Sequence, residues 1–333
     1  MKEAKQLLID VKKGNIKPIY FLMGEEAFFI DMVSGYIEKN ILSEEERGFN
    51  QVILYGKDVS IQDIIANAKR YPMMAERQVV IVKEAQHLKR YIEELASYAE
   101  QPQPTTVLVI CFKYDKIDKR KGLYKALNKT GVVLESKKLY DNQVENWITQ
   151  QLHNKGYQIE PKASFLLVEF LGLDLSRIHN ELEKLRLVIS QNEVITPALI
   201  EQHIGISKDY NNFELKKAIG ERDILKATRI ITYFAQNPKD NPFVLTVSLL
   251  YKFFTQLLQY HGLADKSSRN ISSVLRVSPY FVKEYQIAAK NYPMRKVSQV
   301  VSELRILDLK GKGVGARDLN DIDLLKELLV KII

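Results

Sequence analysis

The sequence predicts an α/β domain with a mostly parallel sheet, followed by domains that are built of helices. Two observations support this prediction. Up to about residue 136, short apolar runs typical of buried strands alternate with segments of helical periodicity. Such alternation is typical of a parallel sheet covered by helices on both faces. From Asn142 onward, the strand pattern disappears and apolar residues recur at helical spacing.

The α/β domain is expected to span residues 1–140 and to contain five strands. The strands are expected at the apolar runs Ile19 to Met23, Asn50 to Tyr55, Gln78 to Val82, Thr106 to Phe112 and Gly131 to Glu135. The connecting helices are expected around residues 27–41, 60–70, 88–100 and 119–128. The first residues, MKEAKQLLIDVKKG, predict an amphipathic helix and not a signal peptide, because charges interrupt the apolar segment.

The remaining sequence predicts two helical domains, over residues 141–208 and 209–333. In the smaller one, three helices are expected: one with Val144, Trp147, Ile148 and Leu152 on one face, one over Pro161 to Leu171, and one capped by Asp174. In the larger one, helices are expected over residues 213–219, 222–236, 242–262, 278–290, 294–310 and 318–332. The wide apolar face of the helix 242–262 indicates either a core or a subunit contact.

Composition limits the class of protein. The 333 residues are 46% hydrophobic, which is enough for a sizeable core. Lys and Arg number 49 against 41 Asp and Glu, and the resulting charge of +8 favours approach to DNA, although a solvated surface would carry it as well. The single cysteine, Cys111, excludes an internal disulfide framework, and no apolar run is long enough to span a bilayer. We therefore expect a cytoplasmic protein.

The segment Pro18 to Asp31 has the strand, turn and helix pattern of a nucleotide-binding site. A phosphate loop needs a glycine-rich turn, a lysine for the phosphate charge and a Ser or Thr hydroxyl for Mg²⁺. Here Gly24 is followed by Glu25, Glu26 and Ala27. Two carboxylates would repel a triphosphate, so we expect these positions to be a degenerate phosphate loop that shapes the domain without binding nucleotide.

The second element of an NTPase is also incomplete. The apolar strand Gln78 to Val82 ends in Lys83 and Glu84, whereas an NTPase has an acidic pair that holds Mg²⁺. The glycine-rich segment Gly311 to Gly315 follows a predicted helix, so it indicates a connection between helices. The five histidines are scattered without zinc-ligand spacing, and no catalytic constellation stands out. We expect no metal site, no cofactor and no intrinsic catalysis.

A cluster of basic residues follows the fourth predicted strand. Two tyrosines, Tyr114 and Tyr124, lie among these residues, and Asp115 and Asp118 oppose the charge. The cluster indicates contact with DNA or an acidic partner, and the alternative is a solvated loop and helix face. Its candidate contact residues are Lys113, Lys116, Lys119, Arg120 and Lys121.

The segment Arg70 to Gln78 places two methionines, Met73 and Met74, in a short loop between a helix and a strand, where Pro72 limits the backbone. Adaptable apolar side chains exposed at a loop tip suit insertion into a hydrophobic pocket of another protein. The alternative is that both side chains tuck under the edge of the sheet.

Three segments together resemble a known family. PIYFLMGEE near residue 20, the apolar pair before Ala-x-Arg in MMAERQVVIV, and GLDLSRIHNELEKL at the end of the second domain are similar to the delta subunit of the bacterial DNA polymerase III clamp loader. The resemblance covers the whole chain in order and in relative length.

The resemblance implies an AAA+-like first domain, a small helical lid domain and a helical collar domain that joins other loader subunits. It implies a subunit that opens the sliding clamp for loading onto primed DNA, within the DNA polymerase III holoenzyme, while other subunits hydrolyse ATP. The implied partners are the clamp, the ATP-hydrolysing subunits, the delta-prime subunit and primed DNA, and no membrane. The apolar pair that enters the clamp corresponds to Met73 and Met74. The alternatives are an active ATPase with an atypical phosphate loop and a DNA-binding scaffold outside replication.

Overall fold

The computed structural model describes residues 2–191, 193–205, 207, 209–315 and 320–332. The chain forms two compact units, residues 1–139 and 140–333. The expected boundary between residues 208 and 209 lies inside the second unit and stays a prediction. Among the described helices, none is both long and apolar enough to cross a membrane.

The first unit is built on a parallel five-stranded sheet with the order β2-β3-β4-β1-β5. The strands are β1 (Ile19–Gly24), β2 (Gln51–Tyr55), β3 (Gln78–Lys83), β4 (Thr106–Lys113) and β5 (Val132–Ser136). They lie at the five apolar runs, so the predicted parallel sheet is confirmed. The central strands β1, β3 and β4 are almost wholly buried, whereas the edge strands β2 and β5 are partly exposed.

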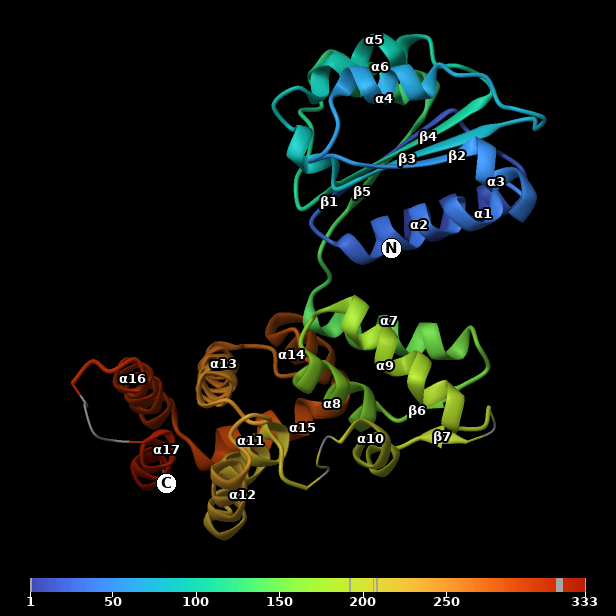
Figure 1. Cartoon of the computed structure of the whole chain (residues 1–333). Coiled ribbons are helices and arrows are strands. Elements are labelled where there is room, and N and C mark those ends of the chain that lie inside the picture. The colour runs from blue at the N-terminus through green and yellow to red at the C-terminus, as the bar shows by residue number, and fades with distance from the viewer. Residues whose placement is uncertain (1, 192, 206, 208, 316–319, 333) are drawn as a thin grey trace. The chain divides into compact units, whose positions relative to one another are not determined.

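Helices cover both faces of the sheet (Figure 1). One face packs against α4 (Ile61–Ala68), α5 (Ala96–Glu100) and α6 (Gly122–Thr130), and the other packs against α1 (Lys2–Lys12) and α2 (Ala27–Asn40). Alternate residues of each strand supply the two faces. Phe21 of β1 lies in the core beside α4 to α6, together with Phe112 of β4. Cys111 is buried in β4, and this burial raises the pKa of its thiol to about 11.

Two local details of the first unit differ from the predicted pattern. The helix expected over residues 88–100 consists of two 3₁₀ turns, Ala85–Leu88 and Ile92–Leu95, followed by the short helix α5. The helix α3 (Glu44–Asn50) was not expected, because its sequence EEERGFN has no apolar periodicity. Its start is stabilised by a capping box, in which the Ser43 hydroxyl accepts from the Glu46 N–H and the Glu46 carboxylate accepts from the Ser43 N–H.

The second unit begins with a helical segment that contains an unexpected pair of strands. Its helices are α7 (Asp141–His153), α8 (Pro161–Leu171), α9 (Leu175–Val188) and α10 (Pro197–Ile204). The expected cap at Asp174 is confirmed, because its carboxylate accepts from the Arg177 N–H at 3.0 Å. The strands β6 (Gln158–Ile159) and β7 (Val194–Ile195) pair in parallel, so the expectation of helices alone after Asn142 was wrong. Two residues are too few to produce a visible alternation.

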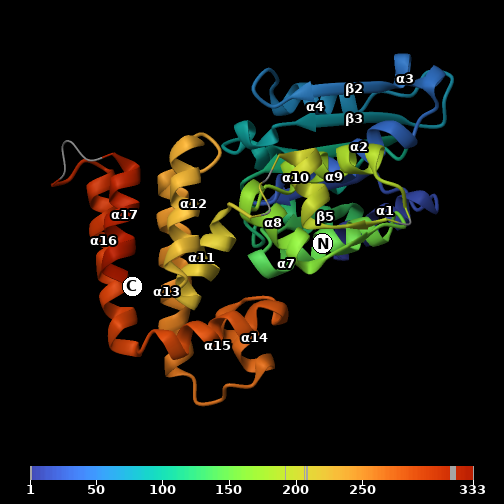
Figure 2. The ribbon, with the colours of Figure 1, turned by 90° about the horizontal axis from the view of Figure 1, so that it is seen from below.

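The rest of the second unit is helical, as predicted. The helices are α11 (Asn212–Glu221), α12 (Ile224–Gln236), α13 (Phe243–Gly262), α14 (Ser268–Leu275), α15 (Val282–Asn291), α16 (Met294–Gly311) and α17 (Asp321–Ile332). Among these helices α14 lacks a predicted counterpart, as does α10 before them, and a 3₁₀ turn, Pro279–Phe281, precedes α15. Residues 318 and 319 of the last predicted helix lie outside the described residues. Both views place α16 beside α17 (Figures 1 and 2).

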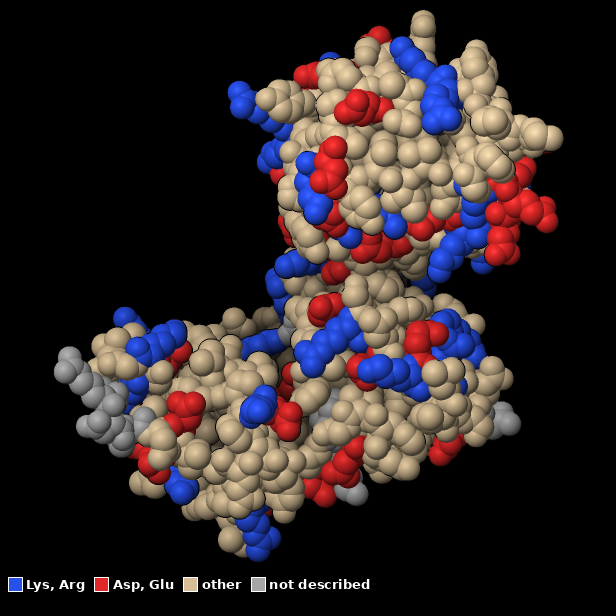
Figure 3. Space-filling view, in the orientation of Figure 1, with Lys and Arg blue, Asp and Glu red and all other residues tan. Residues whose placement is uncertain are grey.

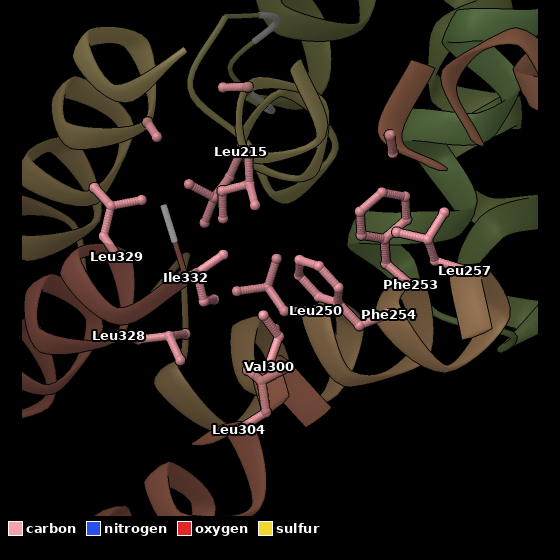
Figure 4. Packing of buried hydrophobic residues seen from close by; sticks show 14 of the residues in the cluster. Leu215, Leu250, Phe253, Phe254, Leu257, Val300, Leu304, Leu328, Leu329 and Ile332 are labelled. Atoms are coloured by element: carbon pink, nitrogen blue, oxygen red, sulfur yellow. The ribbon is translucent and has the colours of Figure 1, made fainter. Parts of the chain in front are cut away.

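The apolar face of α13 forms the core of this region. Leu250 and Phe254 of α13 point toward Val300 and Leu304 of α16, and Leu328 of α17 lies in the same cluster (Figure 4). All five side chains are at most 3% exposed, and full burial of such a side chain stabilises a fold by about 1.5–3 kcal/mol. Of the two interpretations of this face, a core within the chain is therefore correct.

Candidate functional site

The methionine loop, residues 71–76, joins α4 to β3 and extends past the end of the sheet (Figure 1). Met74 is fully exposed, and Met73 is 56% exposed. The alternative in which both side chains tuck under the sheet edge is therefore wrong. Tyr71 is also exposed, so the loop presents three large side chains to solvent. An exposed cluster of this kind is typical of a surface that binds another protein.

A buried side chain from α3 holds the tip of the methionine loop. The Asn50 amide nitrogen donates to the Met73 carbonyl at 2.9 Å, and the Met73 N–H donates to the Asn50 carbonyl oxygen at 2.6 Å. Asn50 is only 3% exposed, so water competes little for these bonds. Both backbone groups of Met73 are thus satisfied by one side chain, which fixes the position of the loop.

The ends of the loop are anchored by Gln78, the first residue of β3. Its Nε2 donates to the Arg70 carbonyl at 2.5 Å and to the Thr106 hydroxyl at 2.8 Å. At the tip, Met74 has φ +55°, a left-handed conformation that is uncommon outside glycine. Asn50 and Gln78 were missed as site residues, because each lies outside the loop and no local pattern marks a polar side chain that binds a distant backbone.

The turn between β1 and α2, where a phosphate loop would lie, is closed by backbone contacts. The Gly24 N–H donates to the Asp115 carbonyl at 3.0 Å, the Tyr114 N–H donates to the Gly24 carbonyl at 2.7 Å, and the Glu25 N–H donates to the Ser136 carbonyl at 2.8 Å. A Cβ on Gly24 would lie 2.0 Å from the Ser136 oxygen. Glycine is therefore required here for the close approach of two backbones, and the amides already have partners.

Glu26 occupies the N-terminus of α2. Its carboxylate accepts from the Phe28 N–H at 3.2 Å, and its carbonyl accepts from the Ser136 hydroxyl at 2.7 Å. The N-terminus of a helix is a favourable position for an anion, and here the side chain itself supplies the negative charge. These contacts agree with the prediction that Glu26 shapes the turn.

The side chains of Lys83 and Glu84 are both engaged in ion pairs. Lys83 lies 3.1 Å from Glu38, and Glu84 lies 3.3 Å from Lys113, which also pairs with Asp31 at 2.8 Å. Partial burial raises the pKa of Glu84, but the partners Gln86 and Lys113 outweigh it and leave the pKa below its usual value. Among the described residues, no group of three or more His, Cys, Asp or Glu is arranged to hold a metal ion.

The candidate DNA-contact residues have acidic partners within the first unit. Lys116 and Lys119 lie 2.9 and 2.7 Å from Glu135, and Arg120 lies 2.8 Å from Asp118. Hydrogen bonds from Lys119 and Lys116 lower the pKa of Glu135 to about 2. On the face shown in Figure 3, basic and acidic residues of this unit lie interspersed. DNA contact by this cluster stays a prediction, and its lysines would have to leave Glu135 to make it.

The fifth residue of the cluster, Lys121, is exposed and forms no ion pair within the described part of the chain. Its backbone precedes α6 as the N-cap, without a side-chain cap. The cluster therefore does not form a continuous basic patch, since four of its five members pair with neighbouring carboxylates, although Lys116 and Lys119 share one.

Family models match both units. The model of the DNA polymerase III delta subunit matches residues 20–137, and the model of the C-terminal domain of that subunit matches residues 209–326. The first match spans the sheet from β1 to β5, and the second spans α11 to the first half of α17.

Individual relatives agree with the family models. DNA polymerase III subunit delta of Bacillus subtilis is 27% identical over 334 residues, which cover 97% of this chain and 93% of the relative. A probable DNA polymerase III subunit delta of Aquifex aeolicus is 21% identical over 226 residues, which cover 64% of this chain and 62% of the relative. The solved structure of the Bacillus subtilis DNA clamp loader delta protein aligns over 99% of both chains, with 26% identity and a TM-score of 0.59.

The two family models match both units in chain order, and one relative matches nearly the whole length. The solved structure has the same succession of folds over that length. The chain therefore belongs to the delta-subunit family of DNA polymerase III, a clamp-loader component of the DNA replication machinery.

Proposed function

We propose that this delta subunit binds the sliding clamp through the methionine loop and holds the ring open without hydrolysing ATP itself. The observation that supports the proposal is the exposed pair Met73 and Met74 on a loop whose backbone is fixed by Asn50. The loop has no catalytic group at its tip, so its contribution is binding. Burial of two methionines contributes about 3–6 kcal/mol to such a contact.

Ring opening then follows from differential binding. A protein that binds one of two states more tightly shifts the population toward that state, and no chemical step is required. A loop that is already ordered loses little conformational entropy on binding, so more of the burial energy is available to favour the open ring. The anchors Asn50 and Gln78 supply this order.

The proposal assigns ATP hydrolysis to partner subunits. The closed turn at Gly24 and Glu25 supports this assignment, because its amides donate to Asp115 and Ser136 and the carboxylates of Glu25 and Glu26 oppose a triphosphate. The proposed partners are the sliding clamp, the ATP-hydrolysing clamp-loader subunits, the delta-prime subunit and primed DNA. The AAA+-like first domain, the lid, the collar formed by residues 209–333 and a cytoplasmic location belong to the same proposal.

The test is the double variant Met73→Ala with Met74→Ala, combined with a pull-down on the sliding clamp of the same organism. Loss of about 3–6 kcal/mol predicts a fall in affinity of at least about 100-fold. The matched control is Met294→Ala, since Met294 is an exposed methionine in the second unit, and clamp binding should be unchanged. Retention of clamp binding by the folded double variant would contradict the proposal.

An ATPase with an atypical phosphate loop would require the amides of Gly24 and Glu25 to leave their backbone partners. Micromolar binding of ATP to the purified chain would favour that function. DNA binding without any clamp binding would favour a scaffold outside replication.

A further inference from the structure

A pocket of about 560 Å³ in the second unit combines aromatic, cationic and amide side chains. It is lined by Tyr140, by residues of α13 and by the end of α14. The side chains that matter are two tyrosines, two cations and two glutamines: Tyr140, Tyr251, Lys252, Arg276, Gln256 and Gln259. No carboxylate is among the described residues that line it. Its volume is within the range of sites for small ligands.

The tyrosine rings are accessible from the pocket. Tyr140 is 59% exposed and Tyr251 is 46% exposed, whereas most aromatic residues of this unit are buried. The Arg276 guanidinium lies 5.0 Å from the centre of the Tyr140 ring. An exposed aromatic ring beside a cation is the pairing on which proteins stack the bases of single-stranded nucleic acids, with about 1–3 kcal/mol per base.

The position of Arg276 is fixed by the fold. Arg276 caps the C-terminus of α14 in a left-handed conformation, φ +56°, and its N–H donates to the Ser272 carbonyl. Gln256 of α13 donates to the Leu275 carbonyl at 2.7 Å and accepts from the Tyr285 hydroxyl at 2.7 Å. These bonds tie the end of α14 to α13 and α15, so the pocket is already formed without a ligand.

The electrostatics of the pocket favour an anion. Desolvation by the surrounding protein lowers the pKa of Lys252, and a bound anion would offset that cost. An adjoining cavity shares Lys252 and Arg276 and contains Glu145 and Glu169. Burial raises the pKa of each of these two carboxyl groups to about 7, so they repel an anion less than ordinary carboxylates do at neutral pH.

We propose that this pocket binds a nucleotide unit of single-stranded DNA, with Arg276 and Lys252 on a phosphate and the rings of Tyr140 and Tyr251 on the bases. The inference deepens the proposed function and rests on it, because it names where the chain holds the DNA that the clamp is loaded on. The cluster around Glu135 also holds rings, since Lys119 lies 5.9 Å from the centre of the Tyr124 ring. Its lysines are paired with a carboxylate, however, whereas no described carboxylate lines the pocket. A free nucleotide shares the chemistry of the ligand, so the test must separate the two sources.

The experiment measures binding of a fluorescent oligo(dT) of about 15 nucleotides to the full chain by anisotropy, at low and at moderate salt. The variant is Arg276→Gln with Tyr140→Ala. The matched control is Arg90→Gln with Tyr91→Ala, since Arg90 lies 5.5 Å from the exposed Tyr91 ring in the first unit and both pairs carry the same charge. We expect the affinity of the pocket variant to fall at least tenfold, with a shallower salt dependence, and that of the control to change less than twofold.

Competition identifies the ligand. We expect unlabelled oligo(dT) to displace the probe, and ATP and polyglutamate to displace it only at much higher concentrations. Displacement by micromolar ATP would assign the pocket to free nucleotides, and displacement by polyglutamate as effective as by oligo(dT) would assign it to acidic proteins. Either result overturns the proposal, as do equal affinities of the folded pocket variant and the wild type, or no oligo(dT) binding by the wild type.

The same variants separate this inference from the proposed function. The pocket variant should retain clamp binding in the pull-down, because the methionine loop is intact. The variant Met73→Ala with Met74→Ala should retain oligo(dT) binding. Loss of only one activity in each variant supports both assignments, while failure of one assay leaves the other informative. Circular dichroism and the thermal midpoint verify that each variant folds.

Discussion

In the first unit, the carboxyl ends and the amino ends of the sheet's strands differ in how their backbone groups are used. At the carboxyl ends of the strands, where parallel α/β sheets usually bind ligands, the amides of Gly24 and Glu25 donate to other parts of the chain. At the amino end of β3, side chains satisfy the backbone and leave Met73 and Met74 exposed. The function is therefore argued from which groups are exposed, here the side chains of Met73 and Met74, and not from the fold itself.

The difference is also one of chemistry. At the carboxyl ends of the strands, backbone contacts and ion pairs, such as those of Lys113 with Asp31 and Glu84, occupy the polar groups. At the amino end of β3, the methionine loop presents apolar side chains on a backbone that is held by Asn50 and Gln78. The contacts at the carboxyl ends therefore stabilise the domain, whereas the exposed loop at the amino end of β3 is suited to contact with a second protein.

The strongest test of the closed edge is Gly24→Ala. The new Cβ would lie 2.0 Å from the Ser136 carbonyl oxygen, and φ at this position is +124°. Two backbones must separate to make room, so we expect a loss of more than about 3 kcal/mol in the free energy of unfolding by urea. The control is Gly35→Ala inside α2, where a Cβ meets nothing within 4 Å and helix propensity predicts a gain of about 0.5–1 kcal/mol. Equal stability of the two variants would mean that the turn is not closed.

The next largest effect concerns the fixed loop at the opposite edge. Asn50→Ala removes both hydrogen bonds to Met73 while both methionines remain. We expect clamp affinity to fall about tenfold, or about 1.4 kcal/mol, because the loop must then be ordered during binding. Unfolding by urea should show a loss of similar size. Asn40→Ala is the control, since Asn40 is exposed and its amide nitrogen donates to the Tyr36 carbonyl within α2. An Asn50→Ala chain that binds the clamp as tightly as the wild type would show that the anchor has no role in binding.

A smaller effect is expected from Glu135→Gln near the carboxyl edge. The lysines Lys119 and Lys116 lower the pKa of Glu135 to about 2, so the ionised carboxylate stabilises the folded state above its unfolded pKa. This contribution is lost as the pH falls from about 5 to about 2. We expect the variant to be less stable by about 1 kcal/mol at pH 7, because solvent screens exposed pairs, and the difference to vanish near pH 2. A difference that is independent of pH would exclude these ion pairs as its cause.

Glu135→Gln also tests the role of the basic cluster. It would leave Lys116 and Lys119 without their shared carboxylate. If the cluster contacts DNA, oligo(dT) affinity at low salt should rise, whereas the pocket at Arg276 predicts no more than a small change.

The strands were predictable because a short, continuous apolar run such as Val107 to Phe112 is stable only when it is buried, as it is in the centre of the sheet. The absence of a phosphate loop was equally visible, since it depends on residue types at adjacent positions. The helix α3 was missed because its stability depends on the capping box at Ser43 and Glu46 and on no apolar stripe. The strands β6 and β7 were missed because two residues form no pattern.

The candidate site depended on contacts that a linear pattern does not contain. The sequence offered Met73 and Met74 as candidates but left their exposure open, and the Asn50 side chain that binds the Met73 backbone lies 23 residues earlier. The basic cluster was visible, yet the neutralising partner Glu135 lies on a separate strand. The pocket at Tyr140 and Arg276 joins segments that are far apart in the chain, so no local signal could have found it.

The central claim is that this chain binds the clamp through the methionine loop and needs no nucleotide at the turn between β1 and α2. The most direct measurement is a calorimetric titration of the purified chain with the sliding clamp, first without nucleotide and then with ATP and Mg²⁺. We predict the same saturable affinity in both titrations, and its loss in the variant Met73→Ala with Met74→Ala. Clamp binding that appears only when ATP is present, or that persists in the double variant, would contradict the claim.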